Sequence, residues 1–564
     1  MKMKKLMAII LAISVLLVGC SSTNEDANST NDGKNQSSIA TNSKYINLTM
    51  VEPTTINPIL NTNQSVGYIM NLVYDGLFTI DQNYNIVPKL VSEYSIASNG
   101  KSIKITLKDA KWHDGSSVTS SDVKYTIDLI KNNTSSPYNQ LIDNLSSVDI
   151  TNNKEFTIHF KESYAFSKDT LIFPIVSKKA LGEDTGSKVL ENSKNLIGNG
   201  KYKIASMNER EGMTLVVNKD YYEELPDTMR DINVGIVPDE DAQVSMVLSL
   251  DSDIAKISLG DLSQFYEDQF NTMDYEGRDY DAIIFNYDKE YIQDENFRKA
   301  LAHSINRDTI LDEGYIGNAK LVNFPLHAKS KFYDNDLNPL GYDKNKAESY
   351  LGKINPGQTK EDLTKDNSTS ENIDNTDDNI NDIKTTNNTK KKDGVNTNNG
   401  LTDAERKTLI SNLDLKIIVN KNNAERTKAA SIVSDNLEAI GIKSTIVALS
   451  DEEMESAISS KDYDLAFVGW ELSSVPDANY IIESTGFTDD KLTNYMNSLQ
   501  SATSDSQIKT IYSQMQKYIR DKVAFISLVI RNDYLVTNRR LEGKSEPNDF
   551  DIYEGIDNYT IKNK

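Results

Sequence analysis

Apolar and polar residues alternate over short stretches in the first part of the chain. Every second residue is apolar at 103–107 and again at 156–160, which predicts two half-buried strands. Tyr45 to Met50 also has the composition of a strand. Between the two alternating strands, Thr119 and Asp122 have the spacing of a capping box, so we expect a helix there that buries Val123, Ile127 and Ile130. This part of the chain is therefore expected to be rich in antiparallel strands.

The later half has a different pattern, in which strands and helices take turns. Strands are predicted at 413–419, 442–449 and 463–468, and helices over 433–440 and 452–460. Gly441 is expected to end the first of these helices. Because strands that alternate with helices build parallel sheets covered on their faces, we expect an α/β unit with a mainly parallel sheet.

The N-terminal residues resemble a bacterial export signal. Lys2, Lys4 and Lys5 precede a short apolar run that ends in Leu17-Val18-Gly19-Cys20. This ending resembles a lipobox, in which the preceding segment is removed and the cysteine carries diacylglycerol. Cys20 is the only cysteine of the chain, and the alternative is an incidental thiol in a plain signal peptide. We expect a signal peptide at 1–19, lipidation of Cys20 and a polar, disordered tether at 20–44.

Length and charge narrow the class of protein further. A chain of 564 residues is too long for one hydrophobic core and suggests two or three domains. Its formal net charge of −23 argues against nucleic acid, whose binding depends on neutralising phosphates. Residues 357–400 are rich in Asn, Asp, Thr and Lys with almost no apolar residue, so we expect a disordered insertion.

Most of the chain from Tyr45 onward resembles the family 5 extracellular solute-binding proteins of bacteria, which bind peptides, dipeptides or nickel. The firmest motifs are Val87-Pro88-Lys89-Leu90-Val91, Lys111-Trp112-His113-Asp114-Gly115 and Val118-Thr119-Ser120-Ser121-Asp122-Val123, in the family's order and spacing. Further support comes from Asn57-Pro58-Ile59-Leu60, Val73-Tyr74-Asp75-Gly76-Leu77 and the segment Phe297-Arg298-Lys299-Ala300-Leu301-Ala302-His303-Ser304-Ile305-Asn306-Arg307. The segment Gly198-Asn199-Gly200-Lys201-Tyr202 departs from the family at Lys201, where a proline is usual.

The resemblance implies an α/β, two-lobed fold like that of periplasmic binding proteins (type II, cluster C), with an extra subdomain on the first lobe. We expect the first lobe at 45–287, its extra subdomain at about 66–190, the second lobe with its insertion at 288–525, and a return to the first lobe at 526–564. The chain would cross between lobes near Phe285-Asn286-Tyr287 and near Phe525-Ile526-Ser527-Leu528. Hinge closure around a ligand would then be the mechanism.

Trp470 is the leading candidate for ligand contact. It is predicted to follow the strand 463–468 directly, and ligands of open α/β sheets gather at carboxyl ends of strands. In family members the corresponding tryptophan lies beside the ligand, although a tryptophan here would also serve simply to close the core. Peptide-binding relatives often place an aspartate three residues later, where this chain has Ser473. Asp477 or Glu471 would substitute for it in pairing with a ligand's amino group.

Three further residues are ligand-binding candidates because of their positions. Tyr138 matches a region that lines the cleft of peptide-binding relatives, and Glu52 lies in the loop after the first strand. Asn286 lies at an expected crossing between lobes. Tyr138 and Glu52 have an equally good interpretation as ordinary surface residues.

Catalytic and metal chemistry find little support. The four histidines, His113, His159, His303 and His327, show no paired metal-binding spacing, and a single cysteine forms no pair. His159 is expected on the polar face of its strand, His303 is expected to be exposed to solvent because it lies off the apolar stripe of its helix, and His113 is expected to be structural. The chain shows no nucleophile elbow, phosphate loop or dinucleotide fingerprint, so neither an enzyme nor a cofactor is expected.

The expected function is therefore capture of short peptides for an ABC importer by a monomer attached to the outer face of the cytoplasmic membrane through its lipid. Its partners would be a peptide and the permease subunits, with no nucleic acid. Three alternatives stay open: a binding protein for a nickel chelate or another small solute, a surface receptor for a peptide signal, and, least favoured, a lipoprotein hydrolase.

Overall fold

The computed structural model describes residues 44–183, 197–208, 210–356 and 400–562. The expected signal peptide, Cys20, almost all of the tether and nearly all of the predicted insertion lie outside these residues. Among the residues described, no helix combines the length and apolar character needed to cross a membrane.

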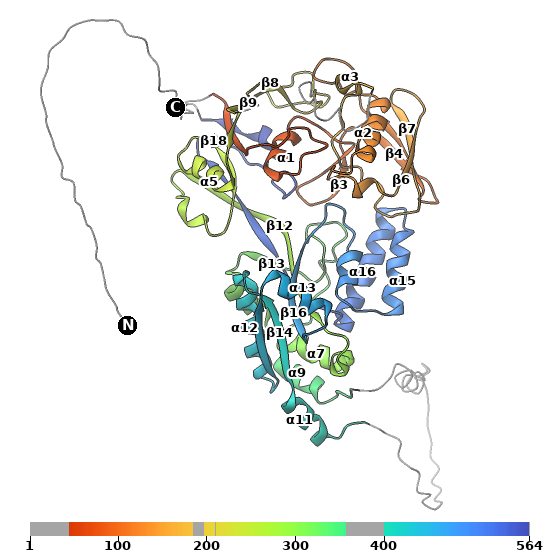
Figure 1. Ribbon diagram of the computed structural model, residues 1–564, viewed down its shortest axis with the longest axis vertical. Coiled ribbons are helices and arrows are strands. Elements are labelled where there is room, and N and C mark those ends of the chain that lie inside the picture. The colour runs from red at the N-terminus through yellow and green to blue at the C-terminus, as the bar shows by residue number, and fades with distance from the viewer. Residues whose placement is uncertain (1–43, 184–196, 209, 357–399, 563–564) are drawn as a thin grey trace, which may run out of the picture. The chain divides into compact units, whose positions relative to one another are not determined.

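An antiparallel four-stranded sheet occupies the first part of the chain, as the alternation predicted (Figure 1). Its order is β4 (Val91–Ile96), β5 (Ser102–Leu107), β7 (Glu155–Phe160) and β6 (Leu145–Ile150). Helix α2 (Ser120–Asn132) begins at the predicted capping box, in which the Asp122 carboxylate accepts from the Thr119 amide at 2.9 Å. The apolar face of α2 is buried, which confirms the expected helix.

A second four-stranded sheet combines a strand that precedes the first sheet in the sequence with strands that follow it. Its order is β1 (Ile46–Val51), β10 (Ile232–Val237), β9 (Gly212–Val217) and β8 (Tyr202–Asn208), with β1 parallel to β10 and the other pairs antiparallel. Shorter elements complete this region: α1 (Gln64–Asn71), the hairpin β2 (Phe78–Ile80) and β3 (Ile86–Pro88), α3 (Lys178–Leu181), α5 (Glu240–Leu248), and the pair β18 (Leu541–Glu542) and β19 (Thr560–Ile561).

The larger sheet is mixed, so the expectation of a mainly parallel sheet is wrong. Its order is β11 (Ile254–Ile257), β17 (Ile526–Asn538), β12 (Phe270–Phe285), β16 (Leu465–Glu471), β14 (Asp414–Asn420) and β15 (Lys443–Leu449), with β13 (Ala319–Leu321) also on β17. Only β14 with β15 and β14 with β16 pair in parallel. The local strand–helix alternation covers that part alone, whereas β12 and β17 come from distant segments and join antiparallel.

This sheet is buried on both faces, because neighbouring residues of its central strands enter different cores. On β16, Ala466 belongs to one hydrophobic cluster, and Leu465 and Phe467 belong to the other. Helices α12 (Ala424–Glu438) and α13 (Asp451–Ser459) pack against β14 and β15, as predicted from the alternation. The other helices of this part are α6 (Glu290–Gln293), α7 (Glu295–Ser304), α8 (Arg307–Thr309), α9 (Lys344–Leu351), α11 (Asp403–Asn412), α14 (Asn479–Ser484), α15 (Asp490–Gln500) and α16 (Asp505–Lys522).

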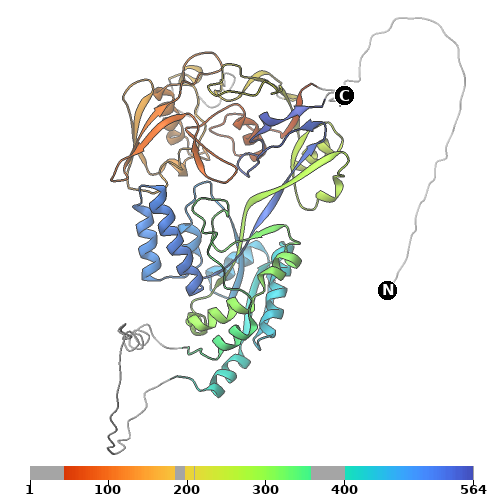
Figure 2. The same ribbon diagram turned by 180° about the vertical axis from the view of Figure 1, so that it is seen from behind.

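Two long antiparallel strands, β12 and β17, connect two parts of the molecule (Figure 1 and Figure 2). The first part contains the two four-stranded sheets, and the second part contains β13 to β16 of the larger sheet. Tyr275 and Leu535 pack in the hydrophobic cluster of the first part, and Tyr280 and Ile530 pack in a cluster of the second. Between them the pairing register shifts at Gly277, where a Cβ atom would lie 2.8 Å from the Arg531 carbonyl oxygen. This packing favours a crossing inside the strands rather than at their ends, where the sequence suggested it.

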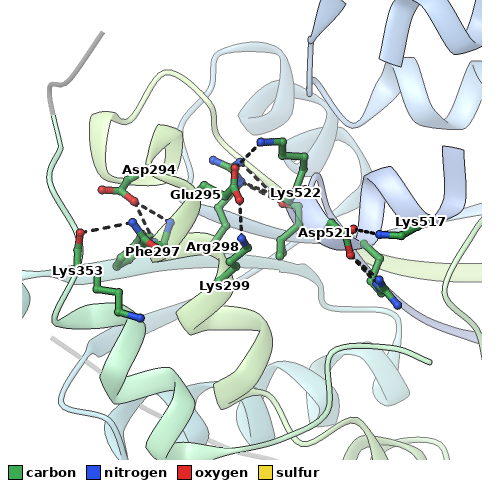
Figure 3. A network of polar contacts seen from close by, with 12 residues as sticks. Asp294, Glu295, Phe297, Arg298, Lys299, Lys353, Lys517, Asp521 and Lys522 are labelled. Carbon is green, nitrogen blue, oxygen red and sulfur yellow. Dashed lines mark hydrogen bonds and ion pairs between the residues drawn. The ribbon is translucent and has the colours of Figure 1, made fainter. Parts of the chain in front are cut away.

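The segment Phe297 to Arg307, which carried part of the family resemblance, has a structural role at Arg298. The buried guanidinium donates to the carbonyls of Ile292 and Gln293 and to those of Lys522 and Val523 at 2.8–3.2 Å. Figure 3 shows this network, in which Glu295 also receives hydrogen bonds from Lys299 and Lys522. Arg298 therefore holds the start of α7 against the end of α16.

His303 is buried, so the expectation that solvent would reach it is wrong. Its Nδ1 atom lies 2.8 Å from the Gly341 carbonyl oxygen, and its ring stacks on Tyr350 of α9. Helix α9 packs over the face of α7 that lies off its apolar stripe, and it therefore shields His303 from solvent. His113 bonds to the Gly200 carbonyl at 3.2 Å, which fits the expected structural role, and His159 is partly exposed beside Asp149.

One segment of the first part packs into the core of the second. Phe166 is fully buried, and its ring centroid lies 6.2 Å from those of Phe332 and Tyr512. Beside it, the buried pair Lys168–Asp169 joins at 2.5 Å. This contact brings residues 164–170 next to the loop that follows β16.

Candidate ligand-binding site

Trp470 lies within a strand rather than after one, which corrects the predicted end of that strand at Val468. β16 continues to Glu471 because its pairing with β12 continues to the pair Asp279 and Glu471. Trp470 is opposite Tyr280 in this pairing, and the two rings stack with centroids 6.0 Å apart. The half-buried indole thereby keeps one fixed position at the end of the strand, where it borders a cavity.

The first cavity, of about 230 Å³, lies between the loop after β16 and segments from three other parts of the chain. Its lining is mainly apolar and comprises Ile80, Tyr84, Pro325, Leu326, His327, Ser330, Trp470, Glu471, Leu472, Ser473, Ser474, Val475, Pro476, Asp477, Tyr480, Ile481 and Phe550. A concave, largely apolar cavity with a few polar groups is the usual form of a small-molecule site.

A second cavity, of about 590 Å³, adjoins the first at the same loop. Ser473, Val475, Asp477 and Tyr480 border both cavities. The other side of the second cavity is formed by residues of the first part of the chain: Gln140, Leu141, Asp143, Asn144, Phe160, Glu162, Ser163, Tyr164, Ser167 and Thr170, with Gln500. Tyr480 is 73% exposed although it is large and aromatic, so its ring is available to an occupant of either cavity.

Asp477 is the acidic residue that lines both cavities. Its Oδ2 atom accepts from the Tyr164 hydroxyl at 2.9 Å, and its Oδ1 atom accepts from the Asn479 amide at 3.0 Å. Burial raises the pKa of the Asp477 carboxyl, because the ionised form loses water contacts. No ion pair between described residues involves this carboxylate, so a bound cation would supply the charge partner it lacks.

The loop that carries Asp477 is fixed by hydrogen bonds of its own. The Tyr512 hydroxyl accepts from the Ala478 amide at 3.1 Å and donates to the Pro476 carbonyl at 2.8 Å. The Ser473 hydroxyl accepts from the Val475 amide at 3.2 Å. Ser473 therefore shapes the loop, and it also faces both cavities.

Glu471 borders the first cavity but already has a cationic partner. Its carboxylate lies 3.1 Å from a guanidinium nitrogen of Arg278, and its side chain is 62% exposed. Of the two carboxylates proposed as substitutes for the family aspartate, Asp477 is thus the less exposed one, and it has no cationic partner in the described chain.

The structure adds His327 to the lining of the first cavity. In the sequence it is one of four histidines without a paired metal-binding spacing. Its Nδ1 atom lies 3.0 Å from Glu276, and its ring stacks on Tyr84 with centroids 3.5 Å apart. His327 and Glu276 are both buried, and burial lowers the pKa of His327. The two residues are 51 positions apart, so nothing in the local sequence indicates the pair.

The other sequence candidates lie away from both cavities. Tyr138 packs against Phe173 in the first core, with ring centroids 6.3 Å apart. Asn286 is buried and donates to the carbonyls of Lys461 and Tyr463 at 2.8 Å each. Glu52 is exposed after β1. Trp470, Ser473, Glu471 and Asp477 are thus brought together, and these three are not.

Metal-ligating residues do not cluster in the described part of the chain, where no group of three or more His, Cys, Asp or Glu side chains is placed to hold an ion.

Comparison with known proteins identifies the family. Residues 85–491 match the model of the bacterial extracellular solute-binding proteins, family 5 Middle. The chain belongs to this family. Its members are substrate-binding proteins of ABC importers and not enzymes, which agrees with a site built from a cavity, an aromatic wall and a carboxylate that forms no ion pair with the described residues.

Individual relatives extend the likeness over most of the chain. The oligopeptide-binding protein AppA of Bacillus subtilis (strain 168) is 22% identical over 527 residues, which cover 89% of this chain and 89% of AppA. The ABC transporter substrate-binding protein CtaP from Listeria monocytogenes superposes with a TM-score of 0.68 at 17% identity, over 92% of this chain and 99% of CtaP. NikZ from Campylobacter jejuni, solved with Ni(L-His), gives 0.58 at 21% identity over 92% and 99%. These structures show that the fold is the two-lobed α/β fold of solute-binding proteins.

Proposed function

We propose that this protein captures short peptides outside the cytoplasmic membrane, in the two cavities beside Trp470 and Asp477, and delivers them to an ABC permease. The observation that carries the proposal is the half-buried Asp477 carboxylate, which has no cationic partner in the described chain and borders both cavities. A peptide's free amino group supplies that charge, and a charge-assisted hydrogen bond to a partly desolvated carboxylate is strong.

The aromatic residues would hold the rest of the peptide. Trp470 provides a fixed flat wall in the first cavity, and Tyr480 lies exposed where the two cavities meet. Rings of this kind contact a peptide over a large area at little cost in conformational entropy. A likeness to the oligopeptide-binding protein AppA over 89% of the chain supports the peptide as ligand class.

Attachment and domain organisation belong to the same proposal. We place the lipid on Cys20 and the tether at 20–44. We place the first crossing between the lobes inside β12 near Gly277, and the return to the first lobe inside β17 between Ile530 and Leu535. Hinge bending in β12 and β17 would close the lobes on the peptide. Exchange of Cys20 for Ser would release the protein from the membrane fraction into the medium, and retention on the membrane would contradict the lipid anchor.

The ligand class is tested by releasing bound molecules from the purified protein by denaturation and identifying them by mass spectrometry. If nothing is released, the protein is first incubated with a mixed pool of short peptides and washed. Recovery of peptides supports the proposal. Recovery of a metal chelate or another small solute in place of peptides would replace the ligand class, since a chelate brings its own metal ligands and needs none from the protein.

A further inference from the structure

The residues that line the two cavities carry charge of one sign. Four of them are acidic, namely Glu471 and Asp477 in the first cavity and Asp143 and Glu162 in the second, with Asp477 shared. Among the described residues that line either cavity, none is Lys or Arg. A cavity lined by carboxylates alone attracts cations and repels anions over several ångströms.

Nearby cations neutralise only two of the four carboxylates. Glu471 pairs with Arg278 at 3.1 Å, and Glu162 pairs with Lys101 at 2.8 Å. Lys161 reaches the backbone carbonyl of Asp143 rather than its carboxylate. In the described chain, no ion pair involves the Asp143 or the Asp477 carboxylate, so the excess negative charge remains in both cavities.

The hydrogen bonding of His327 indicates independently that the first cavity has no cationic group in the described part of its wall. Its Nδ1 atom faces the Glu276 carboxylate, which accepts hydrogen bonds, so Nδ1 carries the proton of the neutral ring. Nε2 is then an acceptor, and it is buried without a hydrogen-bond partner among the described residues, in a side chain that lines the first cavity. The wall of the first cavity therefore contains an unsatisfied acceptor and, among the described residues, no cationic donor.

We propose that this site selects cationic peptides and leaves the peptide's carboxyl end outside both cavities, an inference that rests on the proposed function. A peptide enters with its amino group at Asp477, and a basic side chain reaches the Asp143 side of the second cavity. The terminal carboxylate finds no Lys or Arg in the lining, so it is not held there. Specificity arises as much from rejection of acidic peptides as from attraction of basic ones.

Calorimetry with six matched hexapeptides tests this selectivity. They carry Lys, Gln or Glu at the third position in an otherwise uncharged sequence, each as the free acid and as the C-terminal amide. We expect the Lys peptide to bind about three- to tenfold more tightly than the Gln peptide, and the Glu peptide to bind more weakly than either. We expect each amide to match its free acid within about twofold.

Two variants locate the effect. Asp143→Asn is expected to reduce the preference for Lys over Glu, because it removes a carboxylate of the second cavity that forms no ion pair in the described chain. Glu162→Gln is the control, because Lys101 already pairs with its exposed carboxylate, and it is expected to change the preference less. Equal affinity for all peptides, or much tighter binding of free acids than of amides, would overturn this inference and leave the proposed function standing. Failure of every peptide to bind would overturn both.

Discussion

The Tyr164 hydroxyl donates a hydrogen bond of 2.9 Å to the Asp477 carboxylate, although the two residues are 313 positions apart. Tyr164 comes from the first part of the chain and Asp477 from the loop after β16. Tyr164 borders the second cavity, whereas Asp477 borders both. The hydrogen bond thus connects the two sides of the site at the carboxylate to which we assign the ligand's amino group.

Asp477→Asn is expected to weaken binding of peptides with a free amino end by about 10- to 100-fold, because the charge partner is lost. Binding of the N-acetylated peptide, measured by the same titration, is expected to be equal in both proteins. For the wild type, affinity should fall as pH falls through the pKa of Asp477, which burial raises. A raised carboxyl pKa opposes folding at neutral pH, so the variant without ligand should melt slightly higher than the wild type.

Glu471→Gln is the matched control for this substitution. Its carboxylate is exposed and already paired with Arg278, so a smaller loss of affinity is expected. A larger loss in Glu471→Gln than in Asp477→Asn would assign the amino group to Glu471 and contradict our placement.

The two tryptophans of the chain allow a fluorescence test of the site. Trp470 borders the first cavity, whereas Trp112 is 2% exposed in the first core. Ligand addition should change the emission of the wild type and of Trp112→Phe, and should leave that of Trp470→Phe nearly unchanged. A ligand-induced change that persists in Trp470→Phe and disappears in Trp112→Phe would place the ligand elsewhere.

Phe166→Ala is expected to destabilise the protein by about 3–5 kcal/mol, because a fully buried aromatic side chain is removed from between Phe332 and Tyr512. Denaturant unfolding followed by circular dichroism measures the loss. Ile150→Ala is the control, since Ile150 is 45% exposed and should cost less than about 0.5 kcal/mol. Equal stability of the two variants would show that residue 166 does not join the second core.

Burial raises the pKa of Asp551 to about 8, which makes a prediction about stability and pH. Between the ordinary carboxyl pKa near 4 and this raised value, the folded protein holds a proton that the unfolded chain releases. Stability from this group therefore decreases as pH rises toward 8 and levels off above it. Asp551→Asn should flatten that part of the melting-temperature profile, whereas the same change at the exposed Asp227 should not. An unchanged profile in Asp551→Asn would contradict the assignment.

Local sequence patterns predicted the elements that depend mainly on interactions between residues close in sequence. The alternation in β5 and β7 and the Thr119–Asp122 capping box are visible within a few residues, and the structure confirms them. The end of β16 was predicted three residues early, because Gly469, Trp470 and Glu471 look unlike a strand. Their strand conformation depends on pairing with β12, about 190 positions away in sequence.

The site was predictable only as far as its loop. Trp470 and Ser473 became candidates through the family likeness, and Glu471 and Asp477 through their position in the same loop. Tyr164, Asp143 and His327 reach the cavities from distant segments, and His327 depends on Glu276 for its orientation. Likewise, His303 looked exposed because periodicity describes one face of α7 and cannot show that α9 covers another.

The central claim is tested most directly by calorimetric titration of ligand-free protein, without its first 19 residues, with a lysine-containing hexapeptide that has a free amino end. We expect saturable binding at one site, weakened at least about tenfold both in Trp470→Ala and by N-acetylation of the peptide. The absence of peptide binding in a folded protein that binds a metal chelate or a sugar, with Trp470→Ala behaving like the wild type, would contradict the account.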